Sequence, residues 1–343
     1  MDENFIHSSL KTEDKSFELP LRPICLEEFV GQENIKERLH IFIGAAKKRN
    51  DSLGHMLFSG PPGLGKTTIA NIIAKTMNTN IVVTSGPIVE KPGDLAGVLT
   101  SLKDGDILFI DEIHRLNKAI EEYLYPAMED FTLDLLIDSG PNARGVSVKL
   151  NKFTLIGATT RSGLLSSPLR SRFSFNARLD FYTTKDLEQI ITRSARILNV
   201  EIDKAGANTI AKRSRGTPRI ANNLLKWVRD YSQMNHNKII DKEVANLALK
   251  MLSIDEIGLD EMDKKIISLI IDNFAGGPVG IKTIGVALGE EQTTLEEVYE
   301  PYLIMLGFLK RTPRGREVTK IAYEHMGKIF PNKLGELKSI TPP

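Results

Sequence analysis

One glycine-rich segment ends in a lysine and a threonine, residue types suited to binding phosphates and Mg²⁺. It reads GPPGLGKT over residues 60–67 and fits the pattern G-x-x-x-x-G-K-[ST], between an apolar run and a helical pattern. Glycines allow successive backbone N–H groups to converge on phosphate oxygens, and the start of a helix adds partial positive charge. We predict that Lys66 contacts the β- and γ-phosphates of ATP and that the Thr67 hydroxyl binds Mg²⁺. The alternative is a glycine turn beside a surface lysine.

Two adjacent carboxylates, Asp111 and Glu112, directly follow the apolar run 107–110. Open α/β sheets place their chemistry at the carboxyl ends of strands. We therefore predict that Asp111 holds the metal through Thr67 and water, and that Glu112 polarises the attacking water as the general base. Adjacent acids alone more often cap a helix or face solvent, so this prediction depends on the phosphate-binding loop upstream.

Three further polar side chains are candidates for the same chemistry. Thr160 follows the apolar run 153–158, and its hydroxyl is predicted to sense the γ-phosphate or the attacking water, unless it belongs only to a turn. Arg172 is a candidate arginine finger that a neighbouring subunit delivers to the phosphates; the alternative is a surface salt bridge. Arg219 stands in the first turn of a predicted helix, where its charge opposes the helix dipole, so a negative group is expected nearby.

The elements that carry these residues alternate between strands and helices. Short apolar runs rich in branched residues predict buried parallel strands at 55–59, 81–84, 107–110 and 153–158. Between them lie amphipathic helical patterns, such as those at 67–77 and 116–131. This alternation predicts an α/β domain of three layers with a parallel sheet.

Helical patterns replace strands from residue 184 onward. They predict a second, all-α domain with helices at 185–198, 205–213, 218–234 and 241–251. The pattern lapses near 253–258. A third unit then begins, with predicted helices at 263–274, 281–288 and 293–306 and a basic segment after them.

The composition is that of an ordinary globular protein rather than a disordered, fibrous or membrane protein. Of the 343 residues, 41% are hydrophobic and 26% are charged. No apolar run approaches the ~20 residues of a membrane-spanning helix, and no secretory signal is visible, so we expect a cytoplasmic protein without a membrane partner. The single cysteine, Cys25, agrees with a reducing compartment or with a small buried side chain.

The formal net charge is +1, which is not the charge of a globally basic nucleic-acid binder. Any DNA site must therefore be local. Residues 302–320 are one candidate, because they hold five basic residues against one acid, Glu317. The basic residues are Lys310, Arg311, Arg314, Arg316 and Lys320. A solvated protein face is the alternative.

These motifs occur together in the order and spacing of the AAA+ ATPases, which the chain resembles. The segments concerned are GPPGLGKT, ILFIDEIH, IGATT, LRSRF and GTPRIANNLL. Over essentially its whole length the chain is also similar to the RuvB family, through LRPICLEEFVGQ, ATTRSGLLSSPLRSRF, KRSRGTPRI, GGPVG, EVYEPYL and FLKRTPRGREVT. The resemblance implies an α/β P-loop AAA+ domain over residues 1–182, a small all-α lid domain over 183–253 and a C-terminal winged-helix DNA-binding domain over 254–343.

The resemblance also implies particular site residues. Those implied to contact the nucleotide come from the phosphate-binding loop and from several segments around it: Leu21, Arg22, Gly63, Gly65, Lys66, Thr67, Thr68, Glu129, Asp130, Phe131, Arg172, Tyr182 and Arg219. Arg311 and Arg316 match the arginines of the family that contact DNA. Arg170 is a weaker candidate than Arg172 for a role in the neighbouring subunit.

The function that the resemblance implies is ATP-dependent branch migration of Holliday junctions in recombination and DNA repair. Membership of the family would bring a homohexameric ring around double-stranded DNA, the partner RuvA on the four-way junction, and the resolvase RuvC in the same complex. A hairpin at 133–149 is implied as the docking site for RuvA. The residues DSGPN between apolar flanks also support a hairpin, although an inert insertion is the alternative.

The helix that would read DNA in such a winged-helix domain carries three acids, Glu296, Glu297 and Glu300. They would repel phosphates if this helix lay in a major groove. We therefore expect the basic turn at 311–316 to contact backbone phosphates or a minor groove without reading sequence.

Two other functions stay open. An AAA+ protein unfoldase would require an aromatic pore loop, and the segment after the second predicted strand, residues 86–90, contains no aromatic residue. A nucleotide-gated loader or DNA-binding scaffold would use ATP only to control assembly, although Glu112 argues against an inactive ATPase. ATP turnover with and without duplex DNA distinguishes these functions from a motor.

Overall fold

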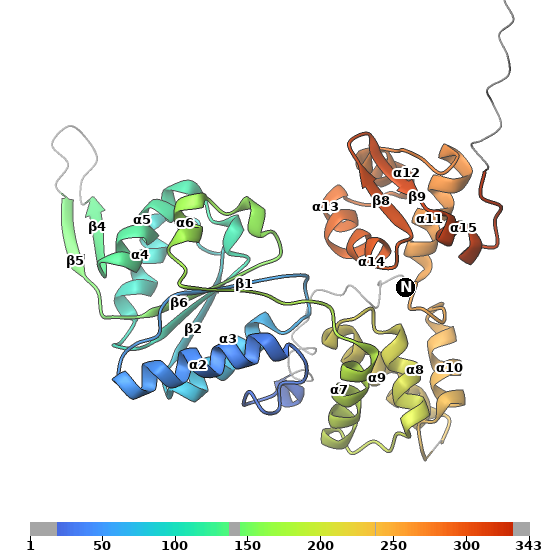
Figure 1. Cartoon of the computed structure of the whole chain (residues 1–343), viewed down its shortest axis with the longest axis horizontal. Coiled ribbons are helices and arrows are strands. Elements are labelled where there is room, and N and C mark those ends of the chain that lie inside the picture. The colour runs from blue at the N-terminus through green and yellow to red at the C-terminus, as the bar shows by residue number, and fades with distance from the viewer. Residues whose placement is uncertain (1–18, 137–144, 237, 332–343) are drawn as a thin grey trace, which may run out of the picture. The chain divides into compact units, whose positions relative to one another are not determined.

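The computed structural model describes residues 19–136, 145–236 and 238–331. Figure 1 shows the whole chain, which its contacts divide into two compact units. One unit consists of residues 10–202 and 216–225, and the other contains residues 203–215 and 226–343. The predicted domain limits at 182 and 253 stay predictions.

A five-stranded parallel sheet forms the centre of the first unit. The strand order is β2-β3-β6-β1-β7, with every neighbouring pair parallel. The strands are β1 (Met56–Ser59), β2 (Ile81–Ser85), β3 (Ile107–Asp111), β6 (Thr154–Thr159) and β7 (Phe175–Arg178). The four predicted strands and the parallel sheet are confirmed. The edge strand β7 was not predicted, because its four residues alternate between buried and exposed and make no apolar run.

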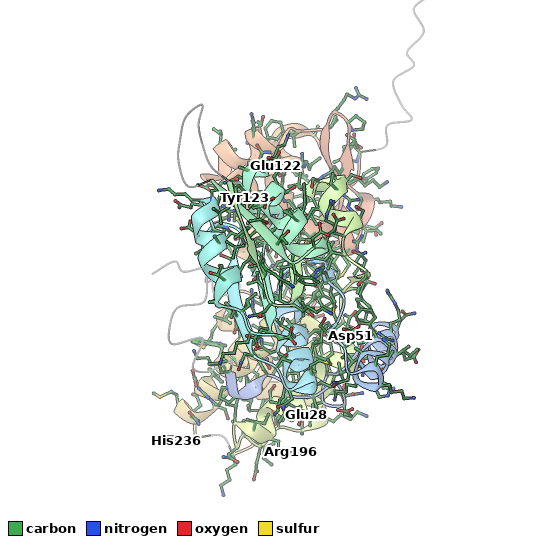
Figure 2. All side chains as sticks on the ribbon, turned by 90° about the vertical axis from the view of Figure 1, so that its left-hand side faces the viewer. Glu28, Asp51, Glu122, Tyr123, Arg196 and His236 are labelled. Carbon is green, nitrogen blue, oxygen red and sulfur yellow. The ribbon has the colours of Figure 1, made fainter. Side chains whose placement is uncertain are left out.

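Helices lie on both faces of this sheet (Figure 1). The helices are α2 (Glu33–Arg49), α3 (Lys66–Met77), α4 (Pro92–Ser101), α5 (Lys118–Glu129) and the short α6 (Ser167–Ser171). Apolar side chains of α4 and α5 pack against one face of β3 and form a continuous core with it. Charged residues such as Glu122 and Arg196 are exposed on the outside of the unit (Figure 2). The predicted α/β architecture of three layers is therefore confirmed.

The predicted hairpin is present as two antiparallel strands, β4 (Thr132–Leu136) and β5 (Gly145–Lys149). Leu133 pairs with Val148 and is fully buried, which anchors the base of the hairpin to the core of the sheet domain. The residues predicted to form its turn, 137–144, lie outside the described residues.

Four helices follow the sheet, at almost the predicted positions: α7 (Thr184–Ile197), α8 (Lys204–Arg213), α9 (Pro218–Met234) and α10 (Lys242–Met251). Side-chain caps begin α7, α8 and α10, because Thr183, Asp203 and Asp241 each accept a hydrogen bond from a backbone N–H of the first turn. The helices α8 and α10 belong to the second unit and pack against each other.

The second unit ends in a winged-helix arrangement. Its helices are α11 (Glu261–Phe274), α12 (Ile281–Leu288), α13 (Gln292–Thr294), the π-helical turn η3 (Leu295–Tyr299), α14 (Glu300–Met305) and α15 (Lys320–His325). The antiparallel strands β8 (Leu309–Thr312) and β9 (Gly315–Val318) form the wing. Apolar residues from both strands and from these helices other than α13 share one core. The predicted third helix is thus helical from 292 to 305, with a π-helical turn in the middle.

Within the part of the chain that the structure describes, no helix combines the length and hydrophobicity that a membrane crossing requires.

Candidate functional site

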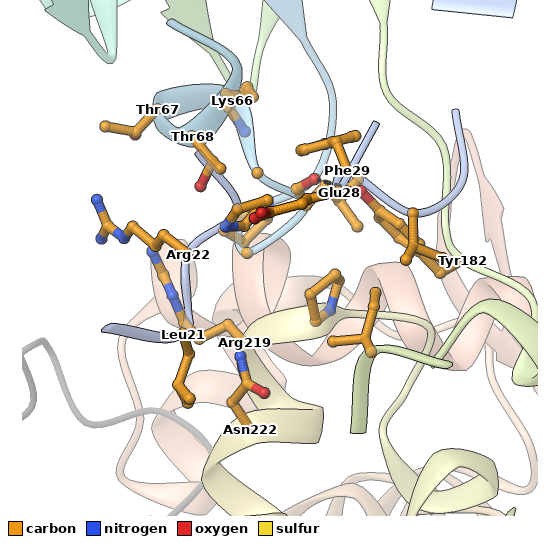
Figure 3. A pocket seen from close by; sticks show the side chains of 18 of the residues that line it. Leu21, Arg22, Glu28, Phe29, Lys66, Thr67, Thr68, Tyr182, Arg219 and Asn222 are labelled. Carbon is orange, nitrogen blue, oxygen red and sulfur yellow. Dashed lines mark hydrogen bonds between the residues drawn. The ribbon is translucent and has the colours of Figure 1, made fainter. Parts of the chain in front are cut away.

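A pocket in the first unit opens beside the glycine-rich segment and contains about 1070 Å³ of space, its open mouth included. Its walls come from an N-terminal segment, the loop before α3, the end of β3, and the start of α9. Figure 3 shows Lys66 and Thr68 on one side of the pocket and Arg219 and Asn222 on the other.

The pocket gathers most of the residues that the sequence and the resemblance single out: Leu21, Arg22, Gly63, Gly65, Lys66, Thr67, Thr68, Asp111, Glu112, Tyr182 and Arg219. These residues come from segments far apart in the chain. Their meeting in one cavity fits a site for a nucleoside triphosphate.

The loop before α3 has the backbone that only glycine adopts readily. Gly60 and Gly65 have φ angles of 135° and 99°. A Cβ atom on Gly60 would lie 2.4 Å from the carbonyl oxygen of Leu179. The loop is held to the sheet by a hydrogen bond of 3.1 Å from the Gly60 N–H to the Thr159 carbonyl. The glycines therefore let the loop turn closely over the strand ends and present the start of α3 to the pocket.

Lys66 folds back over this loop. Its Nζ donates hydrogen bonds to the carbonyl oxygens of Gly60 and Pro61, at 2.8 and 2.9 Å. Burial lowers the pKa of Lys66 to about 8, although the nearby carboxylates of Glu112 and Asp111 act in the opposite direction. The amine is thus a buried cation without a close ion pair to any described residue, and an anionic ligand would stabilise its charge.

Asp111 and Glu112 lie at the end of β3, in the pocket wall. Burial raises the pKa of Asp111, and the charge of Glu112 raises it further. A divalent cation would stabilise the ionised pair. Hard cations prefer oxygen ligands, and the Asp111 carboxylate and the Thr67 hydroxyl are oxygen donors at the same pocket. The residues present therefore fit Mg²⁺ carried by a nucleotide, and no cluster of three metal-ligating side chains occurs among the described residues.

The Glu112 carboxylate is held by the end of the neighbouring strand. Its Oε2 accepts hydrogen bonds from the backbone N–H and the hydroxyl of Thr160, at 3.3 and 3.1 Å. The two residues meet because β3 and β6 are neighbours in the sheet. Glu112 itself has a left-handed backbone, with φ of 46°, which turns the chain sharply at the end of the strand.

Sequence reasoning missed a histidine at this position. The Nδ1 atom of His114 lies 3.1 Å from Oε2 of Glu112 and 2.9 Å from the Thr159 hydroxyl. His114 belongs to the single 3-10 turn η1 (Ile113–Arg115) that follows Glu112. Its presence two residues after a predicted general base was the only signal in the sequence.

A second group of residues that the sequence did not indicate lines the pocket opposite the loop. Arg193 donates one hydrogen bond to the Leu21 carbonyl and another to Glu28, each at 2.7 Å. Phe29 packs over the loop, since a Cβ on Gly65 would lie 3.1 Å from its ring. These contacts fix the N-terminal segment against α7.

Tyr182 and Arg219 join the helical segments to the loop. The Tyr182 hydroxyl donates to the Leu64 carbonyl at 3.0 Å, and the Arg219 N–H approaches the Gly63 carbonyl at 3.4 Å. The Arg219 side chain is close enough to Asp111 to lower its pKa. A negative group is thus present near this arginine, as its place in the first turn of α9 led us to expect.

Four residues implied as nucleotide contacts do not line this pocket: Arg172, Glu129, Asp130 and Phe131. Instead, Arg172 pairs with Glu129 at 3.1 Å and lies over the Tyr125 ring at 4.4 Å. The Phe131 ring packs near Phe153, with 5.9 Å between ring centres. Any contact of these residues with a nucleotide in this pocket requires either a rearrangement or a second copy of the chain.

The two arginines expected to contact DNA lie in the wing, but both are paired with acids of the preceding helix. Arg311 donates to both carboxylate oxygens of Glu300, at 3.0 and 2.7 Å. Arg316 bonds Glu300 and Glu296, and its side chain is only 11% exposed. The carboxylates of Glu300 and Glu296 are thus paired within the domain, and the expectation that the acids of this helix disfavour a major groove stays a prediction. The wing residue Arg314 is exposed, and no hydrogen bond or ion pair holds its side chain among the described residues.

Family profiles match all three parts of the chain. The profile of the Holliday junction DNA helicase RuvB P-loop domain matches residues 21–179, that of the RuvB AAA lid domain matches 182–255, and that of the RuvB C-terminal winged-helix domain matches 256–327.

Named relatives and solved structures agree with these matches. The Holliday junction branch migration complex subunit RuvB of Protochlamydia amoebophila is 65% identical over 326 residues, covering 95% of this chain and 98% of that protein. The subunit of the same name from Chlamydia pneumoniae is 56% identical over 322 residues, covering 94% and 96%. The structure of the Thermotoga maritima RuvB Holliday junction branch migration motor superposes with a TM-score of 0.84 at 54% identity, covering 91% of this chain and all of that one. This chain therefore belongs to the RuvB family of Holliday junction branch migration subunits, with a P-loop AAA+ domain, a lid domain and a winged-helix domain.

Proposed function

We propose that this chain is an ATP-hydrolysing motor that drives branch migration of Holliday junctions, as a ring around double-stranded DNA. The observation that carries the proposal is the position of Glu112. Its carboxylate is bonded to Thr160 at the end of β6 and lies in the same pocket as Lys66. A base beside a phosphate-binding lysine is what hydrolysis requires, whereas binding alone does not need it.

Each residue of the pocket has a separate part in the proposed reaction. The triphosphate would take the place of the Gly60 and Pro61 carbonyls as the partner of Lys66. Glu112 would take a proton from the attacking water, and Thr160 would hold that carboxylate in place. Thr67 and Asp111 would hold Mg²⁺, which neutralises charge on the phosphates when it is bound.

The site would be completed by a second copy of the chain in a homohexamer. Arg172 lies outside its own pocket and is held by Glu129 and Tyr125. Arg170 is bound instead to backbone carbonyls, including that of Ser162 at 2.9 Å. We therefore infer that Arg172 is the residue that neutralises transition-state charge in the neighbouring pocket. Glu129, Asp130 and Phe131 would lie at the same subunit boundary.

The wing would provide the contact with DNA. Arg311 is 56% exposed on its side chain even while it pairs with Glu300, so it has N–H groups available to a phosphate. Arg316 would support the wing from inside, and Arg314 would add a second exposed cation. Contacts of this kind bind the phosphate backbone without reading bases, which suits a motor that moves along DNA.

The hairpin of β4 and β5 would dock on the junction-binding partner RuvA, in a complex that also holds RuvC. Val146 on β5 is an apolar side chain with 42% exposure, on the strand beyond the buried base of the hairpin. An exposed apolar residue on a projecting hairpin fits a protein contact.

The test is the dissociation of a synthetic four-way junction by this protein, with ATP and with or without RuvA. Wild-type protein is expected to dissociate the junction only with ATP, and faster with RuvA. The variant Glu112→Gln is expected to bind a fluorescent ATP analogue normally but to lose hydrolysis by about 100-fold or more, together with junction dissociation. Normal hydrolysis by Glu112→Gln would refute the assignment of the base.

Two rival functions have distinct outcomes in the same assay. A loader or scaffold would bind the junction without ATP turnover that duplex DNA stimulates. A protein unfoldase would show ATP turnover that duplex DNA leaves unchanged.

A further inference from the structure

The His114 imidazole lies between the proposed base, Glu112, and Thr159 at the end of β6, although no part of the proposed reaction uses it. Its Nδ1 atom is 3.1 Å from Oε2 of Glu112 and 2.9 Å from the hydroxyl oxygen of Thr159. The His114 side chain is only 7% exposed, and Thr159 is fully buried. The imidazole is thus held inside the domain, next to the carboxylate rather than in the pocket.

The neighbours of Nδ1 favour one protonation state of His114. An ionised carboxylate attracts an N–H group and repels the lone pair of a bare ring nitrogen, so the 3.1 Å between Nδ1 and Oε2 favours a proton on Nδ1. The hydrogen bond of Nδ1 is made with the Thr159 hydroxyl at 2.9 Å, and that oxygen also accepts one from the Arg161 N–H at 3.0 Å. With the proton on Nδ1, the imidazole donates to Thr159 and keeps its N–H edge beside Oε2.

All the described contacts to the Glu112 carboxylate fall on one oxygen. Oε2 accepts hydrogen bonds from the N–H and the hydroxyl of Thr160 and lies 3.1 Å from Nδ1 of His114. None of the described residues donates a hydrogen bond to Oε1. A carboxylate clamped through Oε2 leaves Oε1 as the oxygen that can accept a proton from water.

The backbone around His114 is built to hold this position. The Arg115 N–H donates to the Glu112 carbonyl at 2.8 Å and closes the turn, and the Ile113 side chain is fully buried. On the outside of the turn, a Cβ on Gly86 would come within 2.5 Å of the Glu112 carbonyl oxygen. The turn is therefore closed by its own hydrogen bond and packed closely against residue 86, which holds the imidazole beside the carboxylate.

We propose that His114 is a positioning residue for ATP hydrolysis, which holds a protonated Nδ1 against Oε2 of Glu112 and so directs Oε1 towards the attacking water. This inference rests on the proposed role of Glu112 as the base. It assigns no contact between His114 and the nucleotide, because His114 is absent from the pocket wall.

Substitution of His114 by asparagine or by glutamine tests which ring nitrogen is needed. The side-chain N–H of asparagine can occupy the position of Nδ1, whereas that of glutamine lies nearer the position of Nε2. His114→Ala is expected to lower kcat for ATP about tenfold or more, with KM for ATP changed by less than about threefold. His114→Asn is expected to stay within about threefold of wild type, and His114→Gln to behave like His114→Ala. Equal activity of the asparagine and glutamine variants would overturn the proposal, even if the alanine variant does not fold.

A control separates positioning from general damage to the fold. Within residues 19–136 and 145–202, His55 is the other buried histidine, and its ring bonds the Met128 carbonyl and the Leu155 N–H, each at 2.9 Å. His55→Asn is expected to lower the melting temperature while kcat of the folded protein stays within about twofold of wild type. A loss of kcat as large as that of His114→Ala would show that any buried histidine has this effect, and would overturn the proposal.

Two further measurements test the link to Glu112. In single-turnover hydrolysis, His114→Ala in the Glu112→Gln background is expected to cause less than about a twofold further loss, because a residue that acts through the carboxylate has no effect without it. Nitrogen-15 spectra of the histidines, assigned with His114→Asn, are expected to show the Nδ1–H form at His114. A full additional loss in the double variant, or an Nε2–H form, would overturn the inference.

The failure of this inference is distinguishable from the failure of the proposed function. If Glu112→Gln itself hydrolyses ATP normally, the proposed base is wrong. If Glu112→Gln is inactive while His114→Ala is fully active, only the role of His114 is wrong.

Discussion

Lys66 carries its charge in a place that water hardly reaches. Only 8% of the residue is exposed, and its partners are the carbonyl oxygens of Gly60 and Pro61 rather than a carboxylate. Burial lowers its pKa from 10.5 to about 8. At a pH between about 8 and 10.5, Lys66 is protonated in the unfolded chain but has lost its proton in the folded chain. The free energy of unfolding of the nucleotide-free protein therefore rises with pH across this window. Below pH 8 the folded protein carries the whole free-energy cost of burying the charged amine.

This titration predicts how nucleotide binding depends on pH. A triphosphate beside Lys66 favours the charged amine, so binding takes up a proton once the free protein has lost it. The affinity for a fluorescent ATP analogue is expected to be flat below about pH 8 and to fall by up to about tenfold per pH unit above it. Lys66→Met is the control, with weaker binding at every pH and no such fall between pH 8 and 9.5. An equal fall in the variant would assign the titration to another group.

At the scale of elements, the wing owes its conformation to a buried carboxylate. Glu300 is 3% exposed, and it lies at the junction of the π-helical turn η3 and α14. Burial raises its pKa, but hydrogen bonds from Arg311 and Arg316 outweigh that effect, and the pKa falls below its ordinary value. The acid therefore holds both arginines of β8 and β9 while it is ionised.

The wing predicts different effects for its arginines. Arg314→Ala is expected to weaken duplex binding by a similar factor on unrelated sequences, without changing the melting temperature. The slope of the logarithm of the binding constant against the logarithm of the salt concentration is expected to become shallower by about one. Arg316→Ala is expected to weaken binding and also to lower the melting temperature, because it removes a partner of Glu300. Binding isotherms on two unrelated duplexes at several salt concentrations, with thermal melts, measure both effects. A loss that depends on the sequence of the duplex would contradict phosphate contact.

A second buried charge joins the segment after α8 to the start of α11. The Arg215 guanidinium is 2% exposed, donates to Asp263 at 3.0 Å and lies 4.5 Å over the Tyr302 ring. Asp263 is also half of the capping box of α11, with Asp260. The pair is enclosed by the winged-helix core, so neither charge can turn to water when the other is removed.

Arg215→Ala is therefore expected to destabilise the second unit by ~3–5 kcal/mol, the usual cost of leaving one charge of a buried pair unpaired. Urea unfolding measures this loss of stability. The matched control on α11 is Lys265→Ala, whose ion pair with Glu261 is exposed on both sides and is expected to change the unfolding midpoint little. Equal losses of stability in the two variants would show that the buried pair contributes no more to stability than the exposed pair.

At the scale of the whole molecule, the separation of Arg172 from its own pocket predicts complementation between subunits. An Arg172→Ala subunit still supplies Glu112 to its own pocket. A neighbouring Glu112→Gln subunit still supplies Arg172 to that pocket. Each variant alone is expected to be nearly inactive. A random mixture of the two in equal amounts should recover about a quarter of wild-type turnover, because one interface in four combines both intact parts. ATP turnover of mixtures at several ratios measures this. No recovery would place Arg172 and Glu112 in the same subunit's site.

The sequence by itself determined the parts of this protein whose chemistry is local. The phosphate-binding loop is a run of consecutive residues, because its backbone N–H groups and glycines act together with the helix that begins at Lys66. The strands β1, β3 and β6 were predictable from apolar runs, since strands buried on both faces need no alternation. The carboxylates at the end of β3 followed from that strand.

Only the tertiary structure decided which distant residues meet. His114 contacts Glu112 and Thr159 because β3 lies beside β6, and no periodicity in the chain encodes that order of strands. Similarly, Arg316 is enclosed by acids that a π-helical turn directs at the wing, so its charge alone did not reveal its burial. Composition and spacing report what a segment can form, whereas the partner of each charged side chain depends on the packing of elements that are far apart in the chain.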